Sequence, residues 1–201
     1  MVADWLKSLN QPQLKAVTHG QGPLLILAGA GSGKTRALTF RAAYLIREKG
    51  IEPKRILLVT FTNKAAKAMK DRVKKLVDSG QDLPFAGTFH SFCAQILRRD
   101  GPQIGLSRDF VIYDEDDSLS VVKEAIANLG LDPKFYKSRP VKAAISQAKN
   151  DLLDPSEYHQ AAKGDFYKNV ARVYPEYQRL LKLYNAVDFD DLLILAVKLL
   201  R

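Results

Sequence analysis

The residues of this chain with the clearest chemistry form one segment, Pro23-Leu-Leu-Ile-Leu-Ala-Gly-Ala-Gly-Ser-Gly-Lys-Thr35. An apolar run leads into a glycine-rich turn, and a segment compatible with a helix follows. A phosphate-binding loop needs this order, because glycines let backbone N–H groups converge on phosphate oxygens and the helix adds its positive dipole end. Lys34 would reach the terminal phosphates, and the Thr35 hydroxyl suits Mg²⁺. Ala28 replaces the first glycine of the strict G-x-x-x-x-G-K-[ST] pattern.

Two side chains near this loop have more than one interpretation. Asn10 and Gln13 fit a capping box at the start of a helix over 11–18. The amide of Gln13 also offers the donor and the acceptor that adenine would pair with. Arg36 lies on the first turn of the helix after the loop, where a cation gains nothing from the helix dipole. A nucleotide neighbour for Arg36 and a solvated arginine are equally compatible with the sequence.

The next predicted strand spans 56–61 and ends with an aromatic residue, and two polar residues follow it. Phe61 could stack on a base, and Thr62 and Asn63 could hold phosphates at the start of a helix over 63–77. Packing of Phe61 in the core is the alternative. Residues off the apolar stripe of this helix give it a basic face: Lys64, Lys67, Lys74 and Lys75.

A third predicted strand, over 85–88, also ends in polar residues. Thr88, His90 and Ser91 lie at the start of a helix that continues through Arg99. The spacing of the apolar residues in this helix predicts that most of them belong to the core: Phe89, Phe92, Cys93, Ile96 and Leu97. A lone histidine is more often structural than catalytic, and no nearby His or Cys supports a metal site.

Three carboxylates occur together in Asp188-Phe-Asp-Asp191. They could bind Mg²⁺, but capping of the last helix is favoured. Because such a cluster repels a phosphate backbone, Phe189 is the group here that would touch a base.

The elements that position these residues change character along the chain. Strands alternate with helices over 1–108, which predicts an α/β fold with a parallel sheet, including a strand at 24–28. Residues 109–185 have the pattern of successive helices, with Gly130 ending one and Pro140 and Pro155 starting others. A strongly apolar helix over 187–200 ends abruptly, so we expect the natural chain to continue past Arg201.

Charge and cysteine content narrow the class of protein. Residues 1–108 hold 18 Lys and Arg against 7 Asp and Glu, a net charge of +11, whereas residues 109–201 hold 13 against 15. This asymmetry suggests a polyanionic partner, although a solubilising surface would explain it as well. One cysteine, no signal-peptide pattern and no long apolar run are typical of a cytoplasmic protein.

In combination, these segments resemble the superfamily-1 DNA helicases of the UvrD/PcrA/Rep type. Residues 9–13 are similar to the Q motif of that family, and residues 60–66, 87–91 and 188–192 to its motif Ia, its motif Ib and the segment before its Walker B strand. The loop is similar to motif I, in which alanine at the first position is usual: Ala28, Gly29, Ala30, Gly31, Ser32, Gly33, Lys34 and Thr35.

The resemblance implies a RecA-like P-loop NTPase sheet, domain 1A, over 1–108. It implies an all-helical inserted subdomain, 1B, over 109–185 and a return to domain 1A over 186–201. It also implies binding of ATP and Mg²⁺ and of single-stranded and duplex DNA, with 3′→5′ translocation. Gln13 would then contact adenine and Arg36 would lie beside the nucleotide. The single strand would meet Phe61, Thr62, Asn63, Thr88, His90 and Phe189.

We find no apolar strand in this sequence that ends in the family's Asp-Glu pair, the Walker B motif. We also find no second motor domain. We therefore expect the isolated chain to fold without turning over ATP. The helicase part of a recombination nuclease–helicase and a non-catalytic DNA-binding module remain alternatives.

Overall fold

The computed structural model describes residues 3–77, 80 and 82–201. The chain divides into two compact units, residues 1–89 and residues 90–201, and each is described by itself. The division falls at the start of one helix, so residues 90–108 belong to the second unit. The division into 1A and 1B segments follows the family resemblance and stays a prediction.

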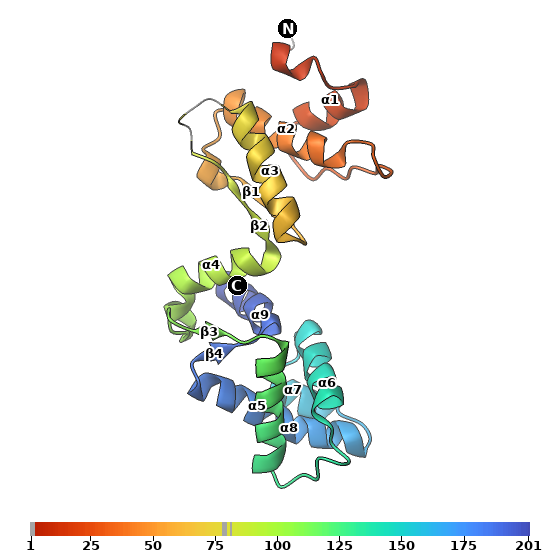
Figure 1. Ribbon diagram of the computed structural model, residues 1–201, viewed down its shortest axis with the longest axis vertical. Helices are drawn as coiled ribbons and strands as arrows, with labels where there is room; N and C mark the ends of the chain where they lie inside the picture. The colour runs from red at the N-terminus through yellow and green to blue at the C-terminus, as the bar shows by residue number, and fades with distance from the viewer. Residues whose placement is uncertain (1–2, 78–79, 81) are drawn as a thin grey trace. The chain divides into compact units, whose positions relative to one another are not determined.

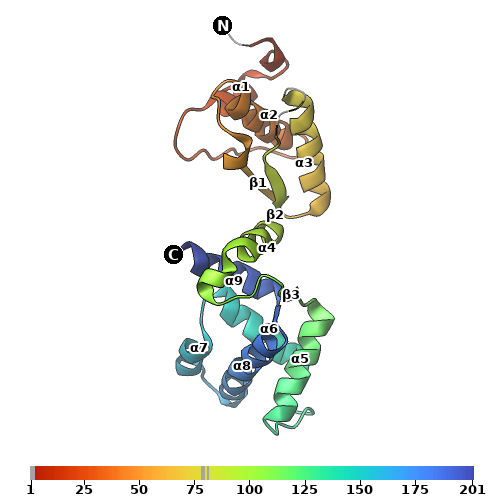
Figure 2. The ribbon, with the colours of Figure 1, turned by 90° about the vertical axis from the view of Figure 1, so that its left-hand side faces the viewer.

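The first unit is built from helices and one short parallel sheet (Figure 1). Strand β1 pairs with β2 in parallel, with Leu57 opposite Phe85 and Thr60 opposite Thr88. Helix α3 runs alongside this pair of strands (Figure 2). The elements are two 3₁₀ turns, at Asp4–Leu6 and Pro53–Arg55, and α1 (Gln11–Thr18), α2 (Lys34–Arg47), β1 (Leu57–Thr60), α3 (Asn63–Leu76) and β2 (Phe85–Thr88).

The core of the first unit depends on the apolar stripe of α3. Met69, Val73 and Val77 are buried, as their spacing predicts. They pack against Ala43 of α2 and Leu58 of β1. This packing fixes α2 and α3 against the sheet, and so it positions the loop residues before each helix.

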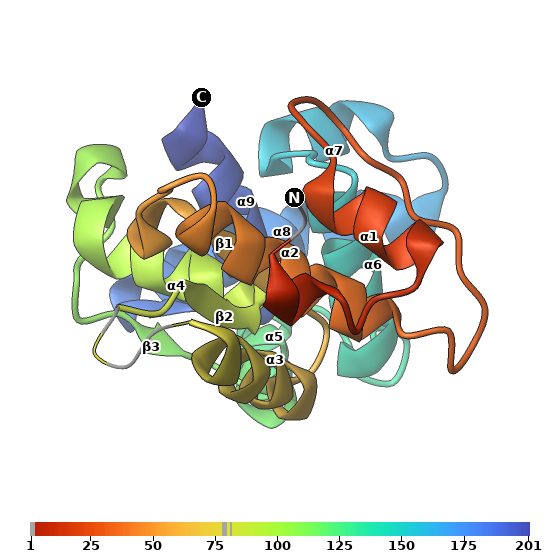
Figure 3. The same cartoon turned by 90° about the horizontal axis from the view of Figure 1, so that it is seen from above.

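The predicted strand at 24–28 is absent from the structure. Residues 19–33 have no regular secondary structure (Figure 3), and Leu25 and Leu27 are 81% and 86% exposed. An extended apolar segment becomes a strand only when a neighbour completes its hydrogen bonds. Within the described part of the first unit, β1 and β2 pair with each other and neither pairs with this segment.

The second unit is mostly helical. Gly130 has a left-handed φ of +64° just after α5, as its predicted helix-ending role requires. Pro140 and Pro155 lie in the first turns of α6 and α7. The elements are α4 (Phe89–Asp100), a 3₁₀ turn at Gly101–Ile104, β3 (Val111–Ile112), α5 (Glu115–Asn128), α6 (Ser138–Asn150), α7 (Pro155–Ala161), α8 (Asp165–Leu183), β4 (Ala186–Val187) and α9 (Phe189–Leu200).

The helical segment leaves and rejoins the rest of the second unit at one place. Strand β3 pairs in parallel with β4, with Val111 opposite Ala186. The predicted last helix therefore begins at Phe189 rather than at 187, because Ala186 and Val187 are used in this pairing. The residues on either side of the excursion share a core that includes Leu97, Phe110 and Leu192. The segment between the two strands therefore begins and ends at neighbouring positions of the second unit.

None of the helices in the described part of the chain is long and apolar enough to cross a bilayer.

Candidate nucleotide-binding and DNA-binding site

The glycine-rich loop adopts backbone conformations that explain two of its glycines. Gly31 and Gly33 have φ values of +74° and +85°, a region that other residues rarely adopt. A Cβ atom on Gly33 would also lie 2.6 Å from the Gln13 side-chain nitrogen. The φ angle of Gly33 therefore favours glycine, whereas the Gln13 amide is the end of a flexible side chain that would have to shift to admit a Cβ atom.

Helix α2 begins directly after this loop without a side-chain cap. Gly33 is its N-cap residue and contributes no side-chain hydrogen bond. In the same unit, α1 and α3 are capped by Asn10 and Thr62. The first N–H groups of a helix have no partners within the helix, and they attract anions. The start of α2 thus keeps donors available for a phosphate.

Lys34 folds back over the loop. Its ammonium donates to the carbonyl oxygens of Ala28, at 3.0 Å, and Gly29, at 2.7 Å. The hydroxyl of Ser32 also donates to the Gly29 carbonyl, at 2.7 Å. Lys34 is an exposed cation held beside the loop by main-chain acceptors alone, and phosphate oxygens would compete for it.

Gln13 completes the predicted capping box, and its side chain also contacts the glycine-rich loop. Its backbone N–H donates to Asn10 Oδ1 at 2.9 Å, and its side-chain oxygen accepts from the Asn10 backbone, which completes the predicted capping box. Its side-chain nitrogen donates to the carbonyl of Ser32 at 3.1 Å. The helix over 11–18 therefore carries Gln13 against the glycine-rich loop, where an adenine contact would require it to be.

Arg36 has neighbours that neither interpretation of the sequence included. Its guanidinium donates to the Ser8 carbonyl at 3.0 Å and lies 5.4 Å from the centre of the Phe40 ring. Arg36 thus ties the segment before α1 to α2.

A hollow of about 560 Å³ opens beside the loop. Gly31, Gly33 and Lys34 form one side of it, and Arg72 and Lys75 of α3 contribute two further cations that the sequence alone did not connect with the loop. A second hollow joins Lys34 and Thr35 to Thr60 at the end of β1. Among the described residues that line the two hollows there is no carboxylate. The residues therefore fit a phosphate chain, and the described residues here would offer Mg²⁺ hydroxyl oxygens, such as that of Thr35, but no carboxylate oxygens.

Phe61 follows β1 and is 91% exposed, so its predicted alternative role in the core is wrong. The register that places Thr60 opposite Thr88 also brings the residues after the two strands together. The rings of Phe61 and Phe89 are 6.1 Å apart and tilted by 48°. Phe89 is 47% exposed, so its assignment to the core was also wrong. Its position after a strand, like that of Phe61, was the signal that could have identified it.

The polar residues of this region lie where the strands end. The Thr62 hydroxyl accepts from the N–H of Ala65 at 3.2 Å, as its predicted capping role requires. Asn63 is exposed at the start of α3, and Thr88 ends β2. An exposed aromatic pair with hydroxyl and amide groups beside it suits a single strand of nucleic acid.

In the second unit, His90 lies against Phe189. Their ring centres are 5.6 Å apart and the rings meet edge to face, at 86°. Phe189 is 48% exposed. The other predicted members of the helix core, Cys93, Ile96 and Leu97, are buried, and Phe92 is half-buried.

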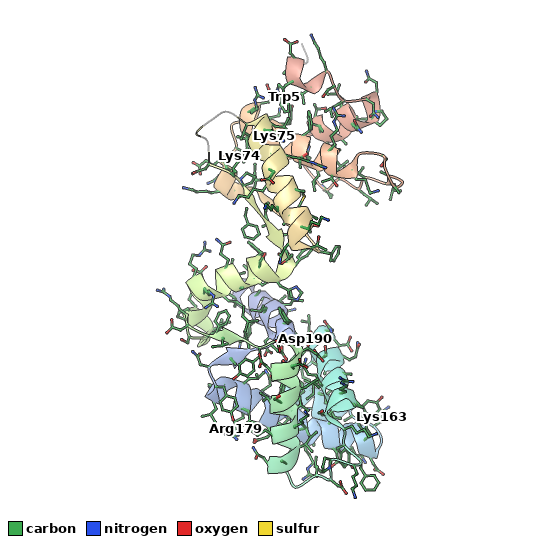
Figure 4. The ribbon with its side chains drawn as sticks, viewed as in Figure 1. Trp5, Lys74, Lys75, Lys163, Arg179 and Asp190 are labelled. Atoms are coloured by element: carbon green, nitrogen blue, oxygen red, sulfur yellow. The ribbon has the colours of Figure 1, made fainter. Side chains whose placement is uncertain are left out.

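The Asp188–Asp191 cluster is structural. Asp188 and Asp191 form a capping box at the start of α9, as the favoured interpretation expected. Lys149 of α6 is fully buried and lies 2.8 Å from Asp188 and 2.7 Å from Asp191. Lys142 pairs with Asp190, which Figure 4 labels, at 3.2 Å. The described residues contain no group of three or more His, Cys, Asp or Glu placed to hold a metal ion.

The charges of this cluster shift two pKa values in opposite directions. Burial alone would raise the pKa of Asp188, but Lys149 and Lys142 outweigh it and hold the pKa at about 2. Burial raises the pKa of Asp191, and the neighbouring Asp188 adds to this effect while Lys149 opposes it.

An Asp-Glu pair also occurs near the end of a strand. Tyr113 separates Asp114 and Glu115 from β3. Asp114 caps α5 by accepting from the N–H of Asp117 at 2.9 Å. The pair is thus explained by the start of a helix in the second unit.

Comparison with known proteins matches residues 9–201 to the UvrD/REP helicase N-terminal domain. The chain belongs to this family. It is 47% identical over 194 residues to the ATP-dependent DNA helicase PcrA of Bacillus subtilis, and 46% identical to those of Staphylococcus aureus and Staphylococcus epidermidis. Each match covers 96% of this chain but only 26–27% of the relative. The chain thus spans about a quarter of the length of these curated relatives.

Proposed function

We propose that this chain is the N-terminal part of an ATP-dependent DNA helicase that moves 3′→5′ on single-stranded DNA. In this proposal the first unit supplies the phosphate-binding half of the ATP site and one part of the DNA-binding surface. Its parallel strands would belong to a RecA-like sheet, and residues 109–185 would form the inserted subdomain.

The observation that carries the nucleotide proposal is the loop before α2. Two glycines with positive φ, an uncapped helix start and an exposed lysine converge there. Backbone N–H groups would hold the phosphate oxygens, and Lys34 would exchange its carbonyl acceptors for them. Gln13 would offer its amide to adenine, and Thr35 its hydroxyl to Mg²⁺.

We propose further that this chain by itself does not turn over ATP. Hydrolysis of this type needs carboxylates that hold Mg²⁺ and orient the attacking water. The described residues around the loop provide cations and hydroxyl groups but no carboxylate. The relatives are about four times as long, which leaves room for the groups that would complete the site.

Titration of the chain with a fluorescent ATP analogue, with and without Mg²⁺, tests the nucleotide proposal. We expect weak binding that inorganic tripolyphosphate displaces, since phosphates would provide most of the contacts. Lys34→Ala should weaken it about tenfold or more, because a charge-assisted hydrogen bond contributes roughly 1.5–3 kcal/mol. Lys15→Ala, at an exposed lysine of α1, is the matched control.

Equal binding by Lys34→Ala and the wild type would contradict the phosphate site. ATP hydrolysis by the isolated chain that DNA stimulates and Lys34→Ala abolishes would contradict the proposed lack of turnover.

A further inference from the structure

We infer that the outer face of α3 is a phosphate track, along which a single DNA strand continues after it has stacked on Phe61. This inference rests on the proposed DNA-binding function and names a surface that the motif residues do not include. The track consists of Lys67, Lys70 and Lys74, with Lys64 at its start; we call these residues the lysine row.

The charge of α3 is strongly one-sided. Its 14 residues contain five lysines and one arginine but a single acidic residue, Asp71. All four side chains of the lysine row are exposed. Among the residues that the structure describes, none forms an ion pair with them.

Helix geometry aligns these lysines. At 100° per residue, Lys67, Lys70 and Lys74 fall within about 60° of one another, centred about 110° around α3 from the buried Met69 and Val73. The helix rises by about 16 Å between Asn63 and Lys74. The result is a straight row of cations, and Figure 4 labels Lys74 near its end.

The row costs the helix stability. Lys64–Lys67, Lys67–Lys70 and Lys70–Lys74 are like-charge pairs at i,i+3 or i,i+4, and each pair destabilises the helix. Lys64 also lies in the first turn, where the helix dipole disfavours a cation. Only Asp71 opposes this repulsion. A polyanion would relieve it, since phosphates neutralise the row and release their own counterions.

The position of the row identifies the polyanion. It begins one residue after Asn63 and three residues after Phe61, whose ring is 91% exposed. Phosphate contacts give affinity without reading sequence, and an exposed ring accepts any base. A duplex has its bases stacked inside and cannot use the ring, so the continuous surface favours a single strand.

Binding of fluorescein-labelled oligothymidylates by the full 201-residue chain tests the inference. Fluorescence anisotropy would be measured at several salt concentrations, with strands of 4 and 16 nucleotides. The test variant is Lys67→Gln/Lys70→Gln/Lys74→Gln, which preserves helix propensity. The control, Lys123→Gln/Lys134→Gln/Lys168→Gln, changes the net charge equally at exposed lysines of the second unit.

With the long strand, we expect the slope of log K against log salt concentration to fall by about 2 in the test variant, because each lost phosphate contact contributes roughly 0.7. With the short strand, which Phe61 and its neighbours can hold alone, affinity should stay within about twofold of the wild type. The control should change neither quantity beyond its general charge effect.

Equal slopes for the test variant and the control would overturn the phosphate track while leaving the proposed function intact. Equal losses on the short and long strands would also overturn it, because the lysines would then act only through net charge. Failure of the wild-type chain to bind any strand would contradict both the track and the proposed DNA-binding role.

Discussion

Phe61 has a large apolar side chain that lies almost wholly in water. Burial of a phenylalanine side chain contributes roughly 1.5–3 kcal/mol to folding, yet 91% of this one remains in water. Its nearest aromatic neighbour, Phe89, is also about half exposed. Neither ring contributes much to the core, and their position after adjacent strands is compatible with the proposed DNA-binding surface.

Phe61→Ala should therefore weaken binding of single-stranded DNA without destabilising the fold. We expect a loss of about 1–3 kcal/mol in binding free energy, the range measured for one base stacked on an aromatic ring. The free energy of unfolding should change by less than about 0.5 kcal/mol. Anisotropy titrations and urea denaturation measure the two quantities.

Phe110→Ala is the matched control, because Phe110 is only 1% exposed. This variant should lose roughly 3–5 kcal/mol of stability. Unchanged DNA affinity in Phe61→Ala would remove Phe61 from the proposed binding surface.

Local rules predicted some residues of the candidate site and not others. The capping box of Asn10 and Gln13 and the cap of Thr62 depend on residues three apart, so the sequence was sufficient. The contact between Arg36 and the Ser8 carbonyl joins segments 28 residues apart and leaves no local pattern. The exposure of Phe89 also depends on strand pairing, which periodicity within one helix does not report.

At the scale of elements, buried ion pairs link α6 to the start of α9. Lys149 is the only described cation within 4 Å of Asp191, and it shares Asp188 with Lys142. The hydroxyl of Tyr177, on α8, also donates to Asp188, at 2.8 Å. Removal of the lysine would leave two carboxylates in the protein interior without their main partner.

Lys149→Met should consequently destabilise the second unit by about 3–5 kcal/mol, the cost of breaking a buried pair from one side. Lys163→Met, at an exposed lysine that Figure 4 labels, should change stability by less than about 0.5 kcal/mol. Urea denaturation followed by circular dichroism gives both values. A loss below about 1 kcal/mol in Lys149→Met would show that the network contributes little.

The same network predicts how stability depends on pH. The pKa of Asp188 is about 2 in the folded state, below the value near 3.9 of an unfolded chain. Its contribution is therefore present above about pH 4 and is lost as the pH falls towards 2. The raised pKa of Asp191 acts above this window, with the opposite sign.

Denaturation midpoints between pH 4 and pH 2 measure this dependence. We expect stability to fall throughout the range in the wild type and to fall less steeply in Asp188→Asn. Equal slopes for the two proteins would contradict the assignment to Asp188.

The elements themselves show where sequence patterns suffice. Helices over 11–18, 63–77 and 187–200 were predicted within a few residues, because caps and apolar periodicity are local. The strand at 24–28 is not found, because an apolar run forms a strand only when a neighbouring strand pairs with it. In the described part of the first unit, neither strand pairs with this segment.

At the scale of the molecule, the two compact units have separate cores. Val73 belongs to a core cluster of the first unit, and Val122 to the large helical core of the second. Units with cores of their own commonly unfold as separate cooperative transitions.

Calorimetry should accordingly resolve two unfolding transitions. We expect Val73→Ala to lower one midpoint and Val122→Ala the other, since both side chains are fully buried. Tripolyphosphate should raise only the midpoint that Val73→Ala lowers, because a ligand stabilises the unit that binds it. Displacement of the same transition by both variants would contradict independent unfolding.

The pairing of β3 with β4 has a consequence for the evolution of this protein. Val111 and Ala186 lie side by side on adjacent strands, which are spaced about 4.8 Å apart in parallel sheets. Parallel strands need a crossover of about a dozen or more residues between them. A shorter or a longer crossover could therefore replace the intervening 74 residues (112–185), provided that both junctions stay in place. Related proteins could exchange, enlarge or shorten this segment by recombination at its two junctions. A segment that replaced residues 112–185 would need a lysine equivalent to Lys149, because its partners Asp188 and Asp191 lie outside the replaced segment.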